Sequence, residues 1–302
     1  MRRRAKLVLG LVFAVTLIGS AVARAQDSSA STIYRLNQGS TYQQGCFPPC
    51  LCPISQAATV AGTLILTPGP NSGSFKTYTV TEVNWVVPFA GRELRVTGSG
   101  TYEVDATQQR LELDLQANGQ PEQLFDSGVV ARRASFPNII ATISLHGERC
   151  FDTVFVVNTS PAPSTQIHPY HLVSGSTFRR GCFPPCLCAL GPKEPLSGNF
   201  TLVDLPPNPL FRNFAVVDVD WEAVTPNAVP PIMVQGNGFY QVGGEVAVQQ
   251  ELSLELAVGG GPVTHFDSGL VVGGGSFPSI DATISINGMR CADTVMVVKA
   301  VR

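Results

Sequence analysis

An eight-residue segment, GCFPPCLC, occurs twice in this chain without a change, at residues 45–52 and 181–188. Further matches accompany it: Trp85 aligns with Trp221 at an offset of 136 residues, and Cys150 aligns with Cys291 at an offset of 141. Self-similarity on this scale indicates that a whole folding unit is duplicated. The predicted organisation is a first β repeat at residues 26–157, a linker at 158–169 and a second β repeat at 170–302.

The first 25 residues have the pattern of a secretory signal peptide. Basic residues at positions 2, 3, 4 and 6 precede a short apolar run at 7–18, and Ala-Arg-Ala at 23–25 fits the cleavage site. We therefore expect a secreted protein, periplasmic or extracellular, whose mature chain begins near Gln26. No later run approaches the roughly 18 apolar residues of a membrane-spanning helix, so no integral membrane segment is expected after cleavage.

Removal of the signal peptide takes away five basic residues and no acidic ones, which leaves 15 Lys and Arg against 22 Asp and Glu. The mature chain is therefore mildly acidic, and it has no cluster of Lys or Arg. Nucleic acids and anionic membranes both attract concentrated positive charge. No nucleic-acid partner is expected, and the predicted partner is an unknown extracellular or envelope ligand, either a protein or a glycan.

Apolar residues recur at every second position within each copy, as in Leu111, Leu113 and Leu115. This period is typical of strands with one buried face, and no segment of the mature chain has the helical period. Further strands are predicted at residues 63–66, 78–87, 94–104, 123–130, 139–145 and 153–157. The fold class is therefore all-β, a tandem repeat of two antiparallel β-sandwich or small barrel domains, with Trp85 and Trp221 in the cores.

The eight cysteines form two sets of four, each with three clustered residues and one distant residue. This even count in an exported chain favours two disulfides per copy. Whatever the pairing, one clustered cysteine must bond to the distant one, so the beginning of each copy is tied to its end. The disulfide candidates are Cys46, Cys50, Cys52 and Cys150 in the first copy and Cys182, Cys186, Cys188 and Cys291 in the second.

The same spacing allows an alternative, a metal-binding module with four cysteine ligands. A Cys-x3-Cys-x-Cys segment with a distant fourth thiolate can form a tetrahedral zinc centre. Export to an oxidising compartment favours disulfides instead, and the paired Cys-x2-Cys motifs of zinc modules are absent. We therefore expect no metal and no cofactor.

Phe-Asp-Ser-Gly also occurs in both copies, at residues 125–128 and 266–269. On these four residues per copy the chain resembles the pepsin-like aspartic proteases, which are secreted, β-rich and duplicated, with one such motif in each lobe. The resemblance implies that Asp126 and Asp267 share a proton and activate water. The motif lies late in each copy here, whereas in that family it lies early. Asp-Ser-Gly also suits a turn in which Asp and Ser bond the local backbone.

Two further acidic residues, Asp152 and Asp293, each follow the distant cysteine of their copy by two positions. An unpaired buried carboxylate is costly. We therefore expect a structural role, either in solvent at a sheet edge or paired with a cation such as Arg149 or Arg290.

Asp218 and Asp220 form an acidic pair at alternate positions, and their counterparts in the first copy are Glu82 and Asn84. Carboxylates at this spacing are compatible with calcium binding. A solvated strand face is the simpler interpretation of both pairs.

The sequence as a whole predicts a secreted, non-catalytic tandem β module for binding, adhesion or envelope structure, with ligand contacts on loops at one end. No enzyme is expected, because the sequence has no nucleophile-elbow, phosphate-loop or zinc-hydrolase motif. The alternatives are a pepsin-like acid protease that uses Asp126 and Asp267, and the four-cysteine metal-binding module.

Overall fold

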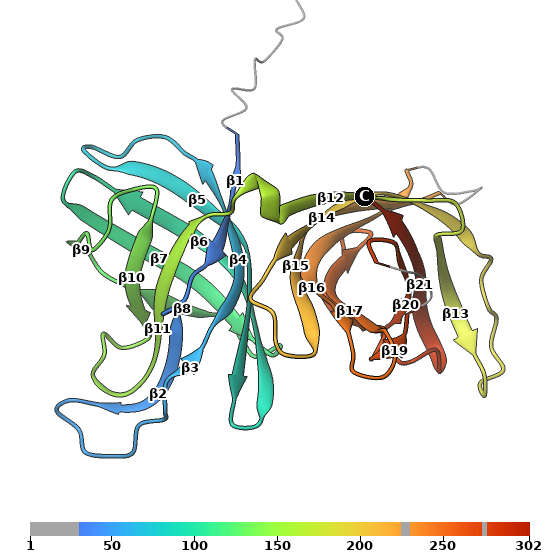
Figure 1. Cartoon of the computed structure of the whole chain (residues 1–302), viewed down its shortest axis with the longest axis horizontal. Helices are drawn as coiled ribbons and strands as arrows, with labels where there is room; N and C mark the ends of the chain where they lie inside the picture. The colour runs from blue at the N-terminus through green and yellow to red at the C-terminus, as the bar shows by residue number, and fades with distance from the viewer. Residues whose placement is uncertain (1–29, 225–229, 274–276) are drawn as a thin grey trace, which may run out of the picture.

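A computed structural model describes residues 30–224, 230–273 and 277–302, so the predicted signal peptide lies outside the described residues. The described chain is all-β and antiparallel, and within these ranges it contains no α-helix, only a 3-10 turn at Ser164–Gln166. Its strands form two separate sheets, one of 11 and one of 10 strands (Figure 1).

The first sheet occupies the first half of the chain. Its strands are β1 (Thr32–Leu36), β2 (Thr41–Phe47), β3 (Ala58–Thr59), β4 (Ala61–Pro68), β5 (Lys76–Phe89), β6 (Arg92–Val104), β7 (Gln108–Ala117), β8 (Gln123–Asp126), β9 (Val130–Ala131), β10 (Ile139–Ser144) and β11 (Cys150–Pro161). Most neighbours in the sheet are also neighbours in sequence, as expected where short turns join antiparallel strands.

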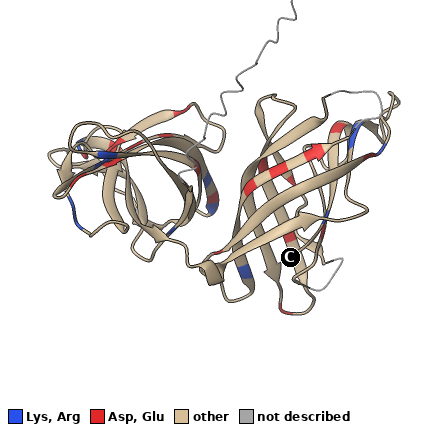
Figure 2. Ribbon diagram, turned by 90° about the horizontal axis from the view of Figure 1, so that it is seen from above, with Lys and Arg blue, Asp and Glu red and all other residues tan. Residues whose placement is uncertain are grey.

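The second sheet has a closely similar strand order. Its strands are β12 (Ile167–Leu172), β13 (Thr177–Phe183), β14 (Glu194–Asp204), β15 (Phe211–Ala223), β16 (Ile232–Gly243), β17 (Gln249–Val258), β18 (Val263–Asp267), β19 (Val271–Val272), β20 (Ile280–Ser285) and β21 (Cys291–Val301). The strands of this sheet form a ring that is viewed end-on in Figure 1. The ring formed by the first sheet is viewed end-on in Figure 2.

Each sheet closes on itself. In the first sheet β1 pairs with both β4 and β11, and in the second β12 pairs with both β14 and β21. Of the two architectures left open by the sequence, these pairings correspond to the small barrel, because a sandwich would consist of two stacked sheets. The strands inside each closed ring have a hydrogen-bonded neighbour on both sides.

The alternating pattern places one side of each strand in the interior. Leu111, Leu113 and Leu115 on β7 are at most 2% exposed, and Trp85 and Trp221 are 0% and 1% exposed. The tryptophans therefore lie in the cores, as predicted. Trp85 packs against Phe155 with ring centroids 5.4 Å apart, an arrangement that adds to the stabilisation from buried apolar area.

The connection between the sheets is shorter than the predicted linker at 158–169. Strand β11 continues to Pro161, because Thr159, Ser160 and Pro161 pair with β1, and β12 begins at Ile167. Only residues 162–166 join the two strands. Residues 158–161 of the predicted linker therefore belong to β11, and residues 167–169 belong to β12.

The two sheets contact each other through equivalent irregularities in β5 and β15, where the pairing register shifts at a bulge. Glu82 and Asp218 occupy these bulges with positive φ angles of 48° and 52°. The Asp218 backbone amide donates a hydrogen bond to Glu82 Oε2 at 3.0 Å. Buried Asn84 donates from Nδ2 to the carbonyl oxygens of Gly238 at 2.6 Å and Val216 at 3.4 Å. Glu82 and Asn84 therefore attach the first sheet to the second.

Glu82 is expected to make the stability of the protein depend on pH. Burial raises the pKa of Glu82 from 4.5 to about 7; the hydrogen bond from the Asp218 amide lowers it, and the Asp218 carboxylate raises it further. The folded chain thus holds a proton that the unfolded chain releases, so stability is lost as the pH rises from about 4.5 to about 7. The loss is at most about 3 kcal/mol, reduced by the partial exposure of the side chain.

The measurement is the unfolding temperature at about pH 5 and about pH 8. Glu82→Gln should flatten the decrease that the unmodified protein shows between these values. Glu148→Gln, which changes an exposed carboxylate in the β10–β11 loop, should leave the decrease unchanged. An equal decrease in the Glu82 variant and the unmodified protein would contradict the prediction.

Candidate functional site

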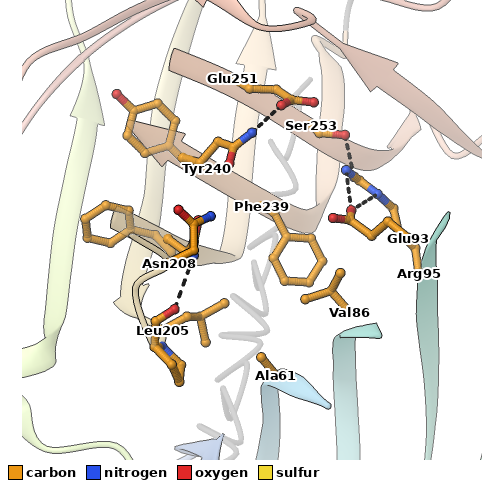
Figure 3. Close-up of a pocket in the computed structure, with 14 residues that line it drawn as sticks. Ala61, Val86, Glu93, Arg95, Leu205, Asn208, Phe239, Tyr240, Glu251 and Ser253 are labelled. Carbon is orange, nitrogen blue, oxygen red and sulfur yellow. Dashed lines mark hydrogen bonds and ion pairs between the residues drawn. The ribbon is translucent and has the colours of Figure 1, made fainter. Parts of the chain in front are cut away.

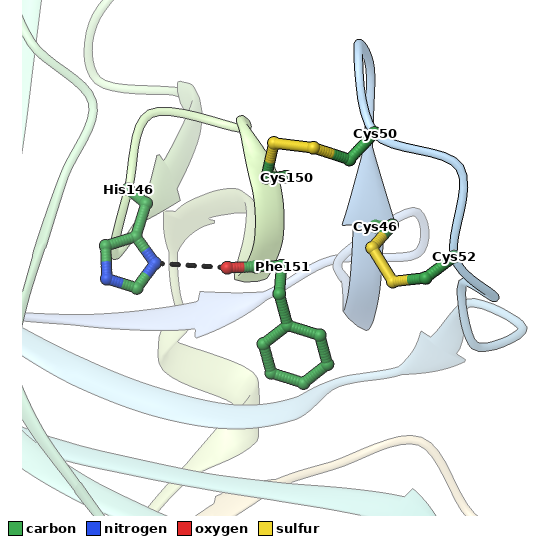
Figure 4. Close-up of a disulfide and its surroundings, with 6 residues drawn as sticks. All are labelled: Cys46, Cys50, Cys52, His146, Cys150 and Phe151. Atoms are coloured by element: carbon green, nitrogen blue, oxygen red, sulfur yellow. Dashed lines mark hydrogen bonds between the residues drawn. A yellow bond between two sulfur atoms is a disulfide. The ribbon is translucent and has the colours of Figure 1, made fainter.

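All eight cysteines form disulfide bonds. The pairs are Cys46–Cys52 and Cys50–Cys150 in the first copy, and Cys182–Cys188 and Cys186–Cys291 in the second. Each copy therefore has one local bond and one bond that joins its beginning to its end, as Figure 4 shows for the first copy. In this structure every sulfur atom that a four-cysteine zinc centre would need is already bonded to another sulfur.

The repeated octet forms a tight turn that directs Cys50 to Cys150. The Cys50 amide donates to the Phe47 carbonyl at 3.2 Å, and the Pro48–Pro49 peptide bond is cis. Gly45 is required before this turn, because its φ is 143° and a Cβ would lie only 2.5 Å from the Cα of Ile54. The octet therefore has a structural function in each copy.

The Asp-Ser-Gly motif forms a turn after β8. Asp126 Oδ1 accepts the Gly128 amide at 2.8 Å, and Ser127 Oγ accepts the Leu111 amide at 2.9 Å. Gly128 has a φ of 62°. Arg110 binds both carboxylate oxygens of Asp126, at 3.0 and 2.9 Å, and this hydrogen bonding lowers the pKa of Asp126.

The second copy of the motif forms the same turn after β18. Asp267 Oδ1 accepts the Gly269 amide at 2.9 Å, and Ser268 Oγ accepts the Leu252 amide at 2.9 Å. Asp126 and Asp267 belong to different sheets. Both aspartates bond the backbone of their own turns, as turn residues do. The Arg110 guanidinium also stabilises the ionised form of Asp126, which is unfavourable for a proton shared between two aspartates.

Asp152 stabilises the loop between β10 and β11 from inside. Its carboxylate, in a residue that is 1% exposed, accepts hydrogen bonds from the backbone amides of Leu145, His146, Glu148 and Thr153 at 2.7 to 3.1 Å. Backbone N–H groups thus replace the expected solvent or arginine partner. His146, on the surface of this loop, has Nδ1 at 3.2 Å from the Phe151 carbonyl oxygen (Figure 4).

Asp293 occupies the equivalent position in the second sheet. It is 7% exposed and accepts the amides of Ile286, Asn287, Met289 and Thr294 at 2.7 to 3.2 Å. Both aspartates therefore have a structural role, as predicted. Their partners are backbone amides, whereas the prediction was solvent or an arginine.

A groove lined by polar side chains lies between the two sheets, and part of it is drawn in Figure 3. Alternate residues of β6 and β17 face into it, because the residues between them, such as Val96 and Leu254, point into the cores. We define the junction groove by these two rows: Glu93, Arg95 and Thr97 on β6, and Glu251, Ser253 and Glu255 on β17.

Arg95 crosses the groove from the first sheet to the second. Its Nη1 donates to Ser253 Oγ, and its Nε donates to Glu93 Oε1 at 3.1 Å. The guanidinium also lies over the ring of Phe239, 5.7 Å from the ring centroid. Figure 3 shows Arg95, Glu93 and Ser253 joined by these contacts above Phe239.

Two cavities adjoin Arg95, with volumes of about 190 Å³ and about 540 Å³. Besides the two rows on β6 and β17, most polar residues that line the cavities have side chains that can both donate and accept hydrogen bonds. These residues are Asn208, Asn213 and Gln241 in the smaller cavity, and Gln116, Asn118, Thr264 and His265 in the larger. Glu255 Oε1 lies 2.8 Å from Nδ1 of His265. The groove therefore presents oriented polar groups from both sheets to one space.

The sequence did not identify these residues. Alternation on β17 indicates that Glu251, Ser253 and Glu255 face outward, but it does not indicate which surface they face. His265 has no histidine counterpart in the first copy, which is typical of an incidental residue, yet it lines the larger cavity. The expected ligand site was on loops at one end, whereas the groove is formed largely by the outer faces of strands.

Comparisons with protein-family models, with curated proteins and with solved structures found no match. Among the residues that the structure describes, no helix has the length and apolar character to cross a membrane. Four disulfides indicate an oxidising, extracellular environment.

Proposed function

We propose that the protein is a secreted, non-catalytic binding module made of two copies of one disulfide-stapled β domain, and that its ligand occupies the junction groove. The observation that carries the proposal is the pair of facing rows on β6 and β17, with Arg95 reaching from one sheet to Ser253 of the other. A site assembled in this way exists only when both copies are present, which gives the duplication a use.

The equivalence of the two halves supports the tandem-copy part of the proposal. Both long-range disulfides join the octet to the start of the last strand, and both carboxylates, Asp152 and Asp293, fill the loop before that strand. A duplicated module explains why each of these features occurs twice.

A non-catalytic role is consistent with how the acidic residues are used. Asp126, the candidate catalytic acid of the first copy, is bound by Arg110 and by the backbone of its own turn. Asp152 is enclosed by backbone amides and 1% exposed, so it has no access to a substrate.

Labelled mature protein applied to arrays of oligosaccharides and tiled peptides tests the proposal. Thr97→Trp places a large side chain in the groove and should weaken binding about ten-fold or more. Thr101→Trp lies on the same outer face of β6 but does not line the groove, so it should bind normally. Arg95→Ala provides a second, independent change within the groove and should also weaken binding.

The proposal is wrong if neither array retains the protein. It is also wrong if the bound signal is the same for the Thr97 and Thr101 variants while both keep the unfolding temperature of the unmodified protein.

A further inference from the structure

The geometry points to a neutral, hydroxyl-rich oligosaccharide as the ligand of the junction groove. This inference rests on the function proposed above and names the class of ligand. Four properties of the groove carry it: its charge, its hydrogen-bonding groups, the apolar surface beside Arg95, and the strands that form its walls.

The charge of the groove disfavours anionic ligands. Three carboxylates, those of Glu93, Glu251 and Glu255, line the two cavities against one guanidinium, that of Arg95. Arg95 is itself engaged by Glu93 and Ser253. A sulfated or phosphorylated ligand would therefore meet like charge without a free cation to compensate it.

The hydrogen-bonding groups of the groove suit hydroxyl groups, which both donate and accept. Gln241 Nε2 donates to Glu251 Oε2, and His265 contacts Glu255, so both carboxylates are already oriented. Each retains lone pairs that can accept from a hydroxyl. Asn208 Oδ1 already accepts the Leu210 and Phe211 amides, and Asn213 Nδ2 already donates to the Pro206 carbonyl oxygen, so Asn208 Nδ2 is left as a donor and Asn213 Oδ1 as an acceptor. Buried sites with matched polar groups discriminate strongly in favour of ligands that satisfy them.

An apolar surface lies beside these polar groups. Phe239, Val86 and Leu205 line the smaller cavity together with Arg95 and Ser253. Small-molecule sites commonly combine an aromatic wall with a few polar groups that fix orientation. A sugar ring suits such a site, because its C–H groups can pack against an aromatic ring. Its hydroxyl groups project from the edge of the sugar ring and can bond the polar groups.

The walls of the groove disfavour an extended peptide. A peptide that binds a sheet by strand addition needs an edge with free backbone groups. Strand β6 is paired with β5 and β7, and β17 is paired with β16 and β18. Apart from the first four residues of β6, which precede its pairing with β7, these strands therefore have no open edge for strand addition.

The length of the groove favours an oligosaccharide over a single sugar. Glu251, Ser253 and Glu255 occupy alternate positions of β17, so the row extends roughly 13 Å at about 3.3 Å per residue. The two cavities adjoin Arg95, which lines both. A ligand that filled both cavities would have to extend past the Arg95 side chain. A single sugar ring is too short for this, whereas several linked sugar rings can do so.

Titration calorimetry with three sets of probes tests the inference: neutral gluco-, manno-, galacto- and N-acetylglucosamine oligosaccharides, heparin-derived oligosaccharides, and the peptides retained on the array. At least one neutral oligosaccharide should bind, with affinity changing less than about two-fold between about 0.05 and 0.5 M sodium chloride. Thr97→Trp should abolish this binding, Thr101→Trp should not, and Glu255→Gln should weaken it about five-fold.

The ways in which this experiment can fail are distinguishable. Tighter, groove-dependent binding of heparin oligosaccharides or of a peptide would overturn the ligand class and leave the proposed binding function intact. If no probe binds in a way that Thr97→Trp changes, both the ligand class and the proposed function are wrong.

Discussion

Replacing Cys50 and Cys150 together by serine is expected to lower the free energy of unfolding of the first copy by up to about 4.7 kcal/mol. The bond spans 100 residues, and in the chain-entropy model a disulfide stabilises the fold by restricting the unfolded chain, more strongly for longer loops. Chemical denaturation of the mature protein, followed by tryptophan fluorescence, measures the change. The second sheet keeps its Cys186–Cys291 bond, so its unfolding provides an internal reference.

The matched control is the pair Cys46→Ser and Cys52→Ser, which removes a bond with a sequence separation of 6. The same model gives about 2 kcal/mol for a loop of this length. The two double variants should therefore differ about two-fold in their effect. Equal losses would show that loop closure is not the origin of the stabilisation.

Replacement of Asp152 by asparagine is expected to cost about 3 kcal/mol. Four backbone N–H groups converge on the carboxylate, and asparagine would keep one acceptor oxygen while placing an NH2 group against amide donors. Buried donors left without a partner cost about 1–3 kcal/mol each, and hydrogen bonds to charged groups are the stronger ones. Equilibrium denaturation of the Asp152 variant measures the loss.

Asp126→Asn is the control for this experiment, because it also removes a carboxylate from the first sheet. Its side chain is 33% exposed and paired with Arg110 at the surface, where an ion pair contributes at most about 1 kcal/mol. Asp293→Asn should reproduce the large effect in the second sheet. If the Asp126 and Asp152 variants lost equal stability, the loop would not depend on the buried carboxylate.

Much of the strand pattern could be predicted because alternation is a local property of sequence. The predicted strand at 94–104 corresponds to β6, and the one at 139–145 corresponds to β10. Strands β1 and β2 were missed, since Gln and Gly interrupt the alternation between Thr32 and Phe47. Both strands pair with β11, whose residues lie more than 100 positions later in the chain. A local sequence pattern cannot indicate such a pairing.

The groove could not be predicted for a related reason. Arg95 and Ser253 are separated by 158 residues, and they meet only because the bulges of β5 and β15 bring the two sheets together. Period-two patterning indicates that Ser253 faces outward, and it assigned no face to Arg95. Whether an outward-facing residue meets solvent or another sheet depends on how closed sheets pack, and the sequence carries no local signal for that.

The disulfide between Cys50 and Cys150 also affects how the protein responds to proteases. Any single backbone cut in the turns between these residues leaves the two pieces covalently joined, and the cut ends stay in a sheet whose remaining strands are still paired. Cys186 and Cys291 give the second copy the same property. In a compartment rich in proteases, a nicked molecule would keep its two sheets and the groove between them, and reduction would be needed to release a fragment.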